Sequence, residues 1–230
     1  MEESVRLKER LLQNSGSGEN EKIEVIALTM GPQQAETVLR EAISLGVDRA
    51  VLLSDRAFAG ADTWATAFTI CRAIKKFENV KLIILGKQTL DGDTGQVGPE
   101  LAQMLNIPFV GYASRVIEIN RNRIMVKRLA EDRYETFEVK LPAAISVGKD
   151  INIPRMPSLR GKLKAKNEQI PVWNKEILGL DEDKVGLSGS YTQVIKIFTP
   201  KHVHETEMIL GTADEQVEKL YQKFKQLNIL

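Results

Sequence analysis

The sequence predicts an α/β fold built on a mostly parallel sheet that is covered by helices on both faces. Three successive segments, at 23–45, 48–77 and 80–105, each contain a short apolar run, a polar loop and an amphipathic stretch. Such strand–loop–helix units form parallel strands joined by right-handed crossovers. From residue 109 onward, shorter apolar runs alternate with turn residues and predict an antiparallel extension.

The elements follow one another in a regular order along the chain. An amphipathic helix is predicted over 3–13 and a polar connector over 14–20. The parallel strands are predicted at 23–28, 48–53 and 80–85, and their helices at 35–45, 63–77 and up to Leu105. The strands of the extension are predicted at 116–119, 124–128, 136–139 and 143–147.

The last third of the chain is less regular. Residues 149–190 contain Pro154, Pro157 and Pro171 and little periodicity, which predicts an extended arm with at most one helical turn, at 160–166. A strand at 192–199 and an amphipathic helix at 214–227 follow. The predicted domains are therefore residues 1–148, an arm at 149–190, and a C-terminal strand and helix at 191–230 that pack on a partner or back on the sheet.

Composition excludes several classes of function. The net charge of +1 gives no broad basic surface for nucleic acid. The single cysteine, Cys71, excludes a disulfide framework and a thiolate metal site and favours the reducing cytoplasm. The N-terminal residues resemble no secretory signal, and no apolar run is long enough to span a membrane.

The stretch from Gly86 to Leu105 is the strongest candidate for function. It places four glycines, Asp91 and Asp93 between a predicted strand and a helix. Backbone N–H groups and the positive end of the helix dipole would meet there, which suits a phosphate. The alternative is an ordinary strand-to-helix loop in which Thr94 caps the helix.

Two further loops follow predicted strands, at 29–32 and 55–62. Because ligands of parallel sheets bind at the carboxyl ends of the strands, all three loops are candidates for one site. His202 and His204 are interpreted as surface residues, and no metal site or catalytic nucleophile motif is present. The pattern favours a protein whose bound cofactor supplies the chemistry.

Several long motifs resemble the beta subunit of electron transfer flavoprotein. They lie in the expected order at 25–32, 55–63, 86–88 and 91–99. Segments 126–128 and 138–143 resemble the signature of that family, and Pro154-Arg155 with 159–166 resembles its partner-recognition loop. The resemblance implies a Rossmann-like fold of the adenine-nucleotide alpha-hydrolase type, and a heterodimer with a flavin-bearing alpha subunit.

The resemblance also implies a cofactor and its contacts. The cofactor is FAD, reduced by NADH, as in electron-bifurcating members, or AMP, as in ordinary ones; the stretch 55–63 is similar to the bifurcating subgroup. The implied diphosphate and ribose contacts are Asp91, Asp93, Thr94, Gly95, Gln96, Val97, Gly98 and Pro99. The implied adenosine contacts are Thr29, Met30 and Gly31, and the residues towards the flavin or NADH are Asp55, Arg56, Phe58, Gly60, Asp62 and Thr63. Phe58 could equally be a core aromatic, and Arg56 a solvated charge.

A partner surface follows from the same resemblance. Leu159 corresponds to an exposed anchor for an acyl-CoA dehydrogenase-type partner, with Arg160 and Lys164 beside it; the alternatives are a leucine packed on its own domain and a solvated basic arm. Family members begin with another strand, which this sequence lacks and which would lie centrally in the sheet. A non-redox adenine-nucleotide-binding regulatory or scaffold subunit is an alternative function, and a hydrolase or ligase of the related nucleotide fold is a third.

Overall fold

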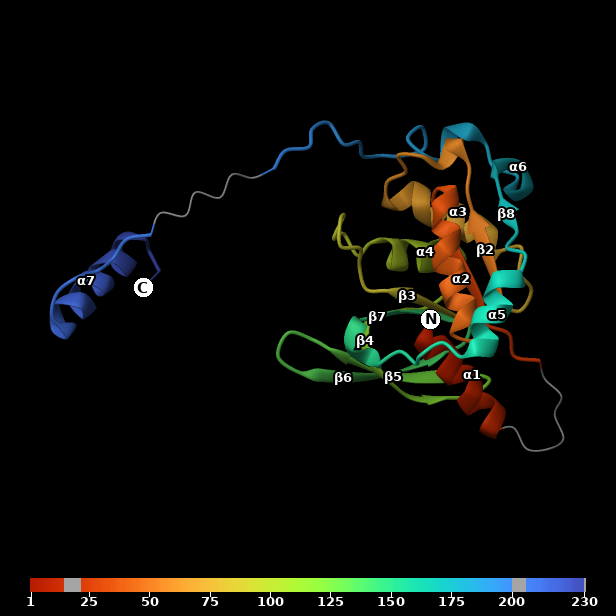
Figure 1. The fold of residues 1–230 in the computed structure, drawn as a ribbon, viewed down its shortest axis with the longest axis horizontal. Coiled ribbons are helices and arrows are strands. Elements are labelled where there is room, and N and C mark those ends of the chain that lie inside the picture. Colours follow the sequence, from red (N-terminus) through yellow and green to blue (C-terminus); the bar gives the residue numbers. More distant parts are fainter. Residues whose placement is uncertain (15–21, 200–205, 230) are drawn as a thin grey trace. The chain divides into compact units, whose positions relative to one another are not determined.

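The computed structural model describes residues 1–14, 22–199 and 206–229 (Figure 1). The chain divides into two compact units, residues 1–193 and residues 194–230. The first unit contains all of the predicted parallel and antiparallel strands, and the described residues of the second include one helix.

The first unit contains two sheets, and its architecture confirms the predicted α/β fold. In one sheet β1 (Ile26–Met30), β2 (Arg49–Leu53) and β8 (Val172–Trp173) lie side by side and parallel. In the other, the order is β3 (Leu82–Gly86), β7 (Ala143–Val147), β4 (Phe109–Ile119), β5 (Arg123–Leu129) and β6 (Tyr134–Lys140). The predicted antiparallel extension is found in β4, β5 and β6. The strand at 143–147 was expected in that extension, but β7 is parallel to both β3 and β4 and lies between them.

Helices connect the strands as the sequence predicts. They are α1 (Glu2–Asn14), α2 (Glu36–Ser44), α3 (Thr63–Ile74) and α4 (Val97–Leu105). Single-turn 3-10 helices lie at Gln33–Ala35, Arg56–Phe58, Lys149–Ile151 and Glu182–Lys184. Strand β1 begins at Ile26, three residues later than predicted, because its pairing with β2 begins there, with Ile26 opposite Arg49. Element type was thus predicted more accurately than element ends, as is usual for patterns read from sequence.

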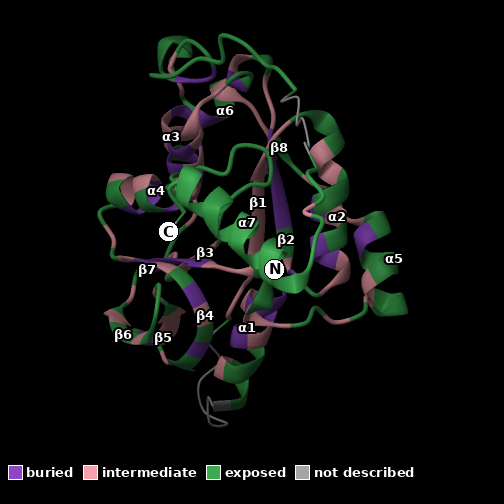
Figure 2. Ribbon diagram, turned by 90° about the vertical axis from the view of Figure 1, so that its left-hand side faces the viewer, coloured by how far each residue is buried: buried purple, intermediate pink, exposed green. Residues whose placement is uncertain are grey.

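Helices α1 and α3 hold the two sheets together. Ile70 of α3 packs against two apolar clusters, one that also includes residues of β1 and β2 and one that also includes residues of β3. Val5 of α1 packs beside β1, whereas Leu7 packs in the cluster that contains residues of β3. Among the described strands, β1 and β3 each have a neighbour on one side only, and every residue of β1 is half-buried while most of β2 is buried (Figure 2).

Residues 149–193 differ from the predicted extended arm, because they belong to the first unit and pack against α2, β2 and the apolar cluster around Phe58. Helix α5 (Leu159–Asn167) lies beside α2, β8 extends the sheet next to β2, and α6 (Lys175–Leu178) follows (Figure 1). Trp173 stacks on Phe77 with ring centroids 5.2 Å apart. Leu178 and Val185 are buried in the same apolar cluster as Phe58. These few apolar side chains, spaced without a helical or strand period, anchor the segment.

The second unit contains α7 (Ala213–Gln226), close to the predicted bounds. Thr212 and Glu215 form a capping box at its start. None of its residues is buried, and Val217, Leu220, Tyr221 and Phe224 form an exposed apolar face. The strand predicted at 192–199 is not formed, because these residues pair with no strand in the described chain. Most of the predicted connector at 14–20, like His202 and His204, lies outside the described residues.

Candidate functional site

The first two candidate loops meet at the carboxyl ends of β1 and β2. Met30 and Leu53 are register partners, and the Gly31 N–H donates a hydrogen bond to the Leu53 carbonyl oxygen at 3.0 Å. Residues 29–31 therefore lie next to the start of the second loop. Thr29, Met30 and Gly31 are all half-buried at this edge.

The second loop is held by backbone hydrogen bonds to Asp55, one from within the loop and one from α6. Asp55 accepts hydrogen bonds from the Ala57 N–H at 2.9 Å and the Lys175 N–H at 3.0 Å. Burial would raise the pKa of Asp55, but these backbone hydrogen bonds outweigh it and hold the pKa below its ordinary value. Phe58 is 5% exposed and lies in the core, while Arg56 is exposed. Asp55 and Phe58 therefore fix the loop, and Arg56 is free to face solvent or a ligand.

The second and third loops are joined where α3 and α4 begin. Asp62 caps α3 by accepting a hydrogen bond from the Ala65 N–H at 3.0 Å. The hydroxyl of the next residue, Thr63, lies 3.1 Å from Glu100 Oε1 and 3.3 Å from Gln96 Oε1. The first loop thus lies beside the start of the second, and the end of the second loop contacts the third through Thr63.

Glu100 belongs to this junction although its sequence context gave no sign of it. Its Oε2 atom is buried and has no hydrogen-bond partner in the described part of the chain. Burial raises the pKa of Glu100, the nearby Asp62 raises it further, and the Thr63 hydrogen bond only partly offsets both. A buried carboxylate oxygen without a partner favours a proton or a donor group beside it. In the sequence Glu100 looks like any polar residue of an amphipathic helix.

The third loop is shaped by its glycines. Gly95 has a φ of +63°, and a Cβ atom on Gly98 would lie 3.0 Å from the Phe109 ring. Thr94 does not cap α4; the cap position is Gln96, whose side chain makes no capping hydrogen bond. The Val97 and Gly98 N–H groups at the start of α4 therefore have no side-chain acceptor from the cap residue and are available to an anion. The predicted neighbours Val97 and Pro99 form the first turn of the helix.

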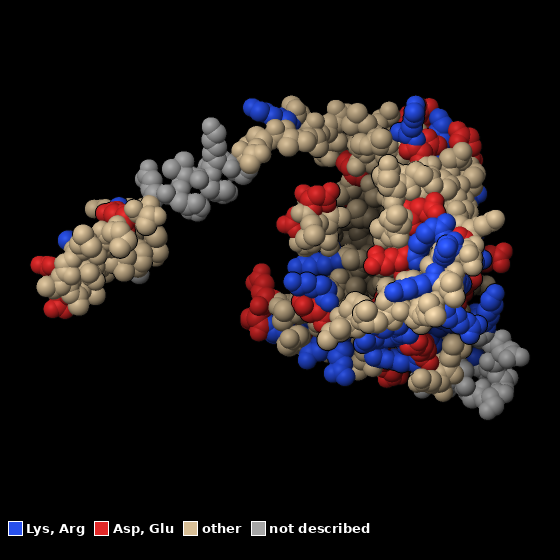
Figure 3. Space-filling view, viewed as in Figure 1, with Lys and Arg blue, Asp and Glu red and all other residues tan. Residues whose placement is uncertain are grey.

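The two acidic residues of the third loop, Asp91 and Asp93, are exposed, and Asp93 accepts a hydrogen bond from Gln88. Hydrogen bonds from the Thr89 side chain and from backbone N–H groups keep the pKa of Asp91 below its ordinary value. Figure 3 shows the face of the first unit hollowed where this loop meets the starts of α3 and α4. The residues present therefore fit a nucleotide, with N–H groups for phosphate and carboxylates for hydroxyls.

The predicted partner-binding residues lie on α5, away from the three loops. Leu159 is 76% exposed and the preceding Met156 is 88% exposed. Arg160 is exposed beside a groove of about 470 Å³ between α5 and the end of α2. Lys164 donates a hydrogen bond to the Asp48 carbonyl oxygen at 2.9 Å, so its ammonium group also ties α5 to the segment that precedes β2.

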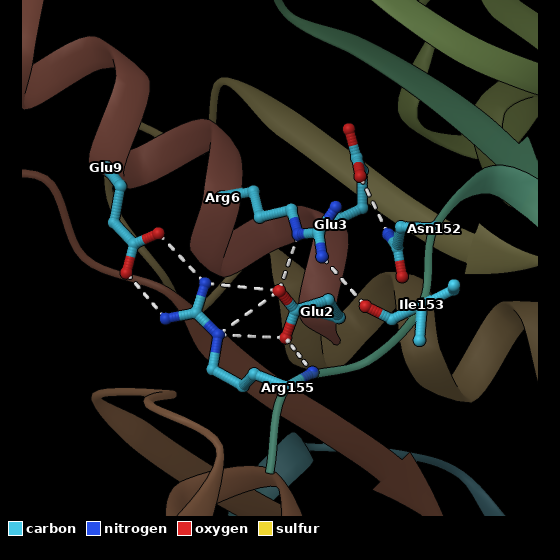
Figure 4. A network of polar contacts seen from close by, with 7 residues as sticks. All are labelled: Glu2, Glu3, Arg6, Glu9, Asn152, Ile153 and Arg155. Atoms are coloured by element: carbon cyan, nitrogen blue, oxygen red, sulfur yellow. Dashed lines mark hydrogen bonds and ion pairs between the residues drawn. The ribbon is translucent and has the colours of Figure 1, made fainter. Parts of the chain in front are cut away.

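The segment before α5 is fixed by an ion-pair network with α1 (Figure 4). The Arg155 Nε lies 2.9 Å from Glu2 Oε2, and its Nη1 lies 2.6 Å from Glu9 Oε1. Arg6 pairs with the same buried Glu2 at 2.6 Å. Burial would raise the pKa of Glu2, but the two arginines outweigh it and hold the pKa at about 2.

Two kinds of feature are absent from the described residues. Within 1–14, 22–199 and 206–229, no three His, Cys, Asp or Glu side chains come together as a metal site would require. None of the helices that the structure describes is both long and apolar enough to cross a membrane.

Comparison with known proteins agrees with the motifs. A family model described as the electron transfer flavoprotein domain matches residues 15–178. The caffeyl-CoA reductase-Etf complex subunit CarD of Acetobacterium woodii is 45% identical over 213 residues, which cover 92% of this chain and 81% of that protein. The electron transfer flavoprotein subunit beta of Thermoanaerobacterium thermosaccharolyticum is 39% identical over 231 residues, covering 100% and 84%.

A third relative has a reductase-linked name. The acryloyl-CoA reductase electron transfer subunit gamma of Anaerotignum propionicum is 40% identical over 214 residues, covering 90% of this chain and 80% of that protein. The matched residues, 15–178, include all three loops and helix α5. The likeness therefore includes the candidate site. The chain therefore belongs to the electron transfer flavoprotein family, as a beta-type subunit.

Proposed function

We propose that this beta-type subunit binds an adenine nucleotide at the carboxyl edge of its parallel strands, and that this nucleotide is FAD rather than AMP. The observation that carries the proposal is the junction of Thr63, Gln96 and Glu100, which joins the loops after β2 and β3. The uncapped start of α4 and the glycines of the third loop support a phosphate there.

Each group of residues has a distinct task in this proposal. Gly95, Gln96 and Gly98 would bind the diphosphate through backbone N–H groups, and Asp91 and Asp93 would accept hydrogen bonds from ribose hydroxyls. Thr29, Met30 and Gly31 would border the adenosine. A bound FAD supplies a ring that accepts and releases electrons, and the protein supplies its position and surroundings.

The second loop would face the reactive end of the cofactor. Arg56 is the exposed cation of that loop, and Thr63 lies at its far end beside Glu100. Asp55, Gly60, Asp62 and the buried Phe58 would hold these two residues in place rather than touch the cofactor. NADH would be the electron donor, and a flavin-bearing alpha subunit would receive electrons in a bifurcating scheme. Transfer itself would need no catalytic side chain of this chain.

A titration tests nucleotide binding with a matched pair of glycines. Gly95 and Gly179 have nearly equal φ values of +63° and +62°, but only Gly95 lies in the proposed site. Either glycine-to-alanine change should cost about 1 kcal/mol of unfolding free energy through backbone strain. Only Gly95→Ala should weaken binding of FAD and AMP to the full chain in calorimetry, by about ten-fold or more. Equal affinities in both variants, or no binding by the wild-type chain, would contradict the proposal.

A spectroscopic test separates electron transfer from a non-redox role. The complex of this chain with its alpha subunit should carry a flavin spectrum that bleaches when NADH is added. AMP binding without any bleaching would instead favour the regulatory or scaffold alternative.

Docking of a dehydrogenase-type partner is assigned to Leu159, with Arg160 beside it. An apolar side chain that is 76% exposed gains about 1.5 to 3 kcal/mol when a partner buries it. Leu159→Ala should therefore raise the KM for the partner dehydrogenase about ten-fold while leaving the thermal midpoint unchanged. Leu129→Ala, at a 54% exposed leucine of β5, is the control. An unchanged KM in Leu159→Ala would exclude Leu159 as the anchor.

A further inference from the structure

Strand β4 contains a bulge beside the third loop. Val110 is the register partner of Ile145 and Ala113 that of Val147, so Gly111 and Tyr112 together face the single residue Ser146. Two residues opposite one define a β-bulge, and bulges often turn a side chain towards a functional site. Here the bulge lies level with the carboxyl ends of β3 and β7, where the candidate site begins.

Tyr112 adopts an unfavourable backbone conformation at this bulge. Its φ is +60°, which a bulky residue rarely adopts and which costs on the order of 1 to 3 kcal/mol. Its N–H donates a hydrogen bond to the buried Ser146 Oγ at 3.0 Å. The surrounding sheet therefore enforces a conformation that the residue alone would avoid, and such strain is concentrated at functional sites.

The bulge places the Tyr112 ring against the third loop. The side chain is not in the core, because Tyr112 is 47% exposed. A Cβ atom built on Gly95 would lie 3.6 Å from the Tyr112 hydroxyl oxygen. The Lys87 Nζ lies 4.9 Å from the centroid of the same ring. Core packing therefore does not explain the position of the Tyr112 side chain, whereas its contacts with Lys87 and the third loop do.

Lys87 is a cation of this edge for which the described residues provide no acidic partner. It directly follows β3, and its N–H donates a hydrogen bond to the Val147 carbonyl oxygen at 2.9 Å, which fixes its backbone. In the described part of the chain no carboxylate lies within ion-pair distance of its ammonium group. A cation held over an aromatic ring keeps its charge available to an anion.

We propose that Lys87 binds a phosphate of the nucleotide, and that Tyr112 positions the Lys87 ammonium group for this contact. The inference rests on the proposed nucleotide function and adds two residues to it. A lysine ammonium suits phosphate as a compact point charge with three donors. It would also offset the negative charge of Asp91 and Asp93 on the same loop, so that a phosphate can approach the start of α4.

The test compares a ligand that has a phosphate with one that lacks it. The full chain is titrated with AMP and with adenosine, and the ratio of the two affinities reports the phosphate contact. Lys87→Gln should reduce the affinity for AMP about ten-fold to a hundred-fold, because a charge-assisted hydrogen bond is lost, and should leave adenosine affinity unchanged. The salt dependence of AMP binding should fall in the same variant.

The chain offers a matched control for Lys87. Lys127 of β5 also lies over a tyrosine ring, with its Nζ 4.0 Å from the centroid of Tyr134. Lys127→Gln removes the same charge and the same kind of ring contact away from the three loops. It should leave both affinities at their wild-type values.

Variants of Tyr112 separate positioning from a general structural role. Tyr112→Phe keeps the ring and should keep AMP affinity within about two-fold, whereas Tyr112→Leu should lower it several-fold and spare adenosine. In the double variant with Lys87→Gln, Tyr112→Leu should have no further effect on the AMP-to-adenosine ratio. A merely structural tyrosine would instead change both affinities together, with or without Lys87.

The outcomes distinguish this inference from the proposed function. If the wild-type chain binds AMP but Lys87→Gln keeps the full preference for AMP over adenosine, Lys87 does not bind the phosphate and the nucleotide site stands. If the wild-type chain binds neither ligand, the proposed function fails and this inference fails with it.

Discussion

An aspartate in a loop before a helix can either hold the backbone or bind a ligand, and the second loop contains two such aspartates. Asp55 and Asp62 were expected to lie towards a ligand, yet their carboxylates accept backbone hydrogen bonds that hold the loop and begin α3. Asp62 also accepts a hydrogen bond from the Thr192 N–H at 3.0 Å, far along the chain. Sequence alone cannot separate a capping aspartate from a ligand-binding one, because both occur in polar loops before helices.

Glu2 provides a test of acid stability at the residue scale. Its folded-state pKa of about 2 is below the ordinary value of 4.5, so the unfolded chain takes up the proton first as the pH falls. The stabilisation from its pairs with Arg155 and Arg6 is therefore complete above about pH 4.5 and is lost as the pH falls towards 2.

Glu2→Gln should lower the free energy of unfolding at pH 7 by about 2 to 4 kcal/mol, because it leaves Arg155 and Arg6 without their buried partner. Denaturant titrations at several pH values should show this difference shrinking between pH 4.5 and 2. Asp181→Asn, in an exposed pair with Lys184, is the control and should change nothing. A difference that stays constant down to pH 2 would contradict the assigned ionisation.

At the scale of elements, the sequence predicted what depends on local pattern. The parallel strands, helices α1 to α4 and helix α7 follow from apolar periodicity and were placed within a few residues. The insertion of β7 between β3 and β4, and the pairing of β8 with β2, depend on contacts between distant residues. Helix α5 was expected to be one turn, because Gly161 and four basic residues obscure its pattern.

In the candidate site too, features set by local pattern could be predicted, whereas features set by contacts between distant residues could not. The three loops could be predicted because each follows an apolar strand and contains turn residues. Glu100 and Tyr112 could not, since the first resembles a surface residue of a helix and the second reaches the loop only through a bulge. Whether a side chain faces a ligand depends on register, which pattern alone does not determine.

The exposed apolar face of helix α7 leads to a prediction about the heterodimer. Its apolar face of Val217, Leu220, Tyr221 and Phe224 is exposed, and we expect this face to pack on the alpha subunit. Phe224→Glu should weaken the heterodimer about ten-fold or more in a binding titration, because it places a charge in an apolar interface. The thermal midpoint of the chain alone should not change.

Gln226→Glu is the control, because it introduces the same side chain on the opposite face of α7. It should leave the affinity for the alpha subunit at its wild-type value. If both variants weaken the heterodimer equally, or neither does, the apolar face of α7 is not the contact.

The whole molecule combines a unit that contains the candidate nucleotide site with exposed apolar side chains that we expect other proteins to cover. Residues 1–193 form the sheets and the candidate site, and residues 194–230 contain α7. On the first unit, α5 presents Leu159 at a distance in sequence from all three loops, and Arg155 ties the preceding segment to α1. Such a division suits an electron carrier, which must hold a cofactor firmly and partners briefly.

Measuring the content of adenine nucleotide in the purified heterodimer tests whether this chain binds FAD. The complex is denatured mildly, and the released nucleotides are separated, identified and counted against each protein chain. We predict two FAD molecules per heterodimer, one of them held by this chain. A single FAD with one AMP would contradict the preference for FAD, and a single FAD with no second adenine nucleotide would contradict the nucleotide site itself.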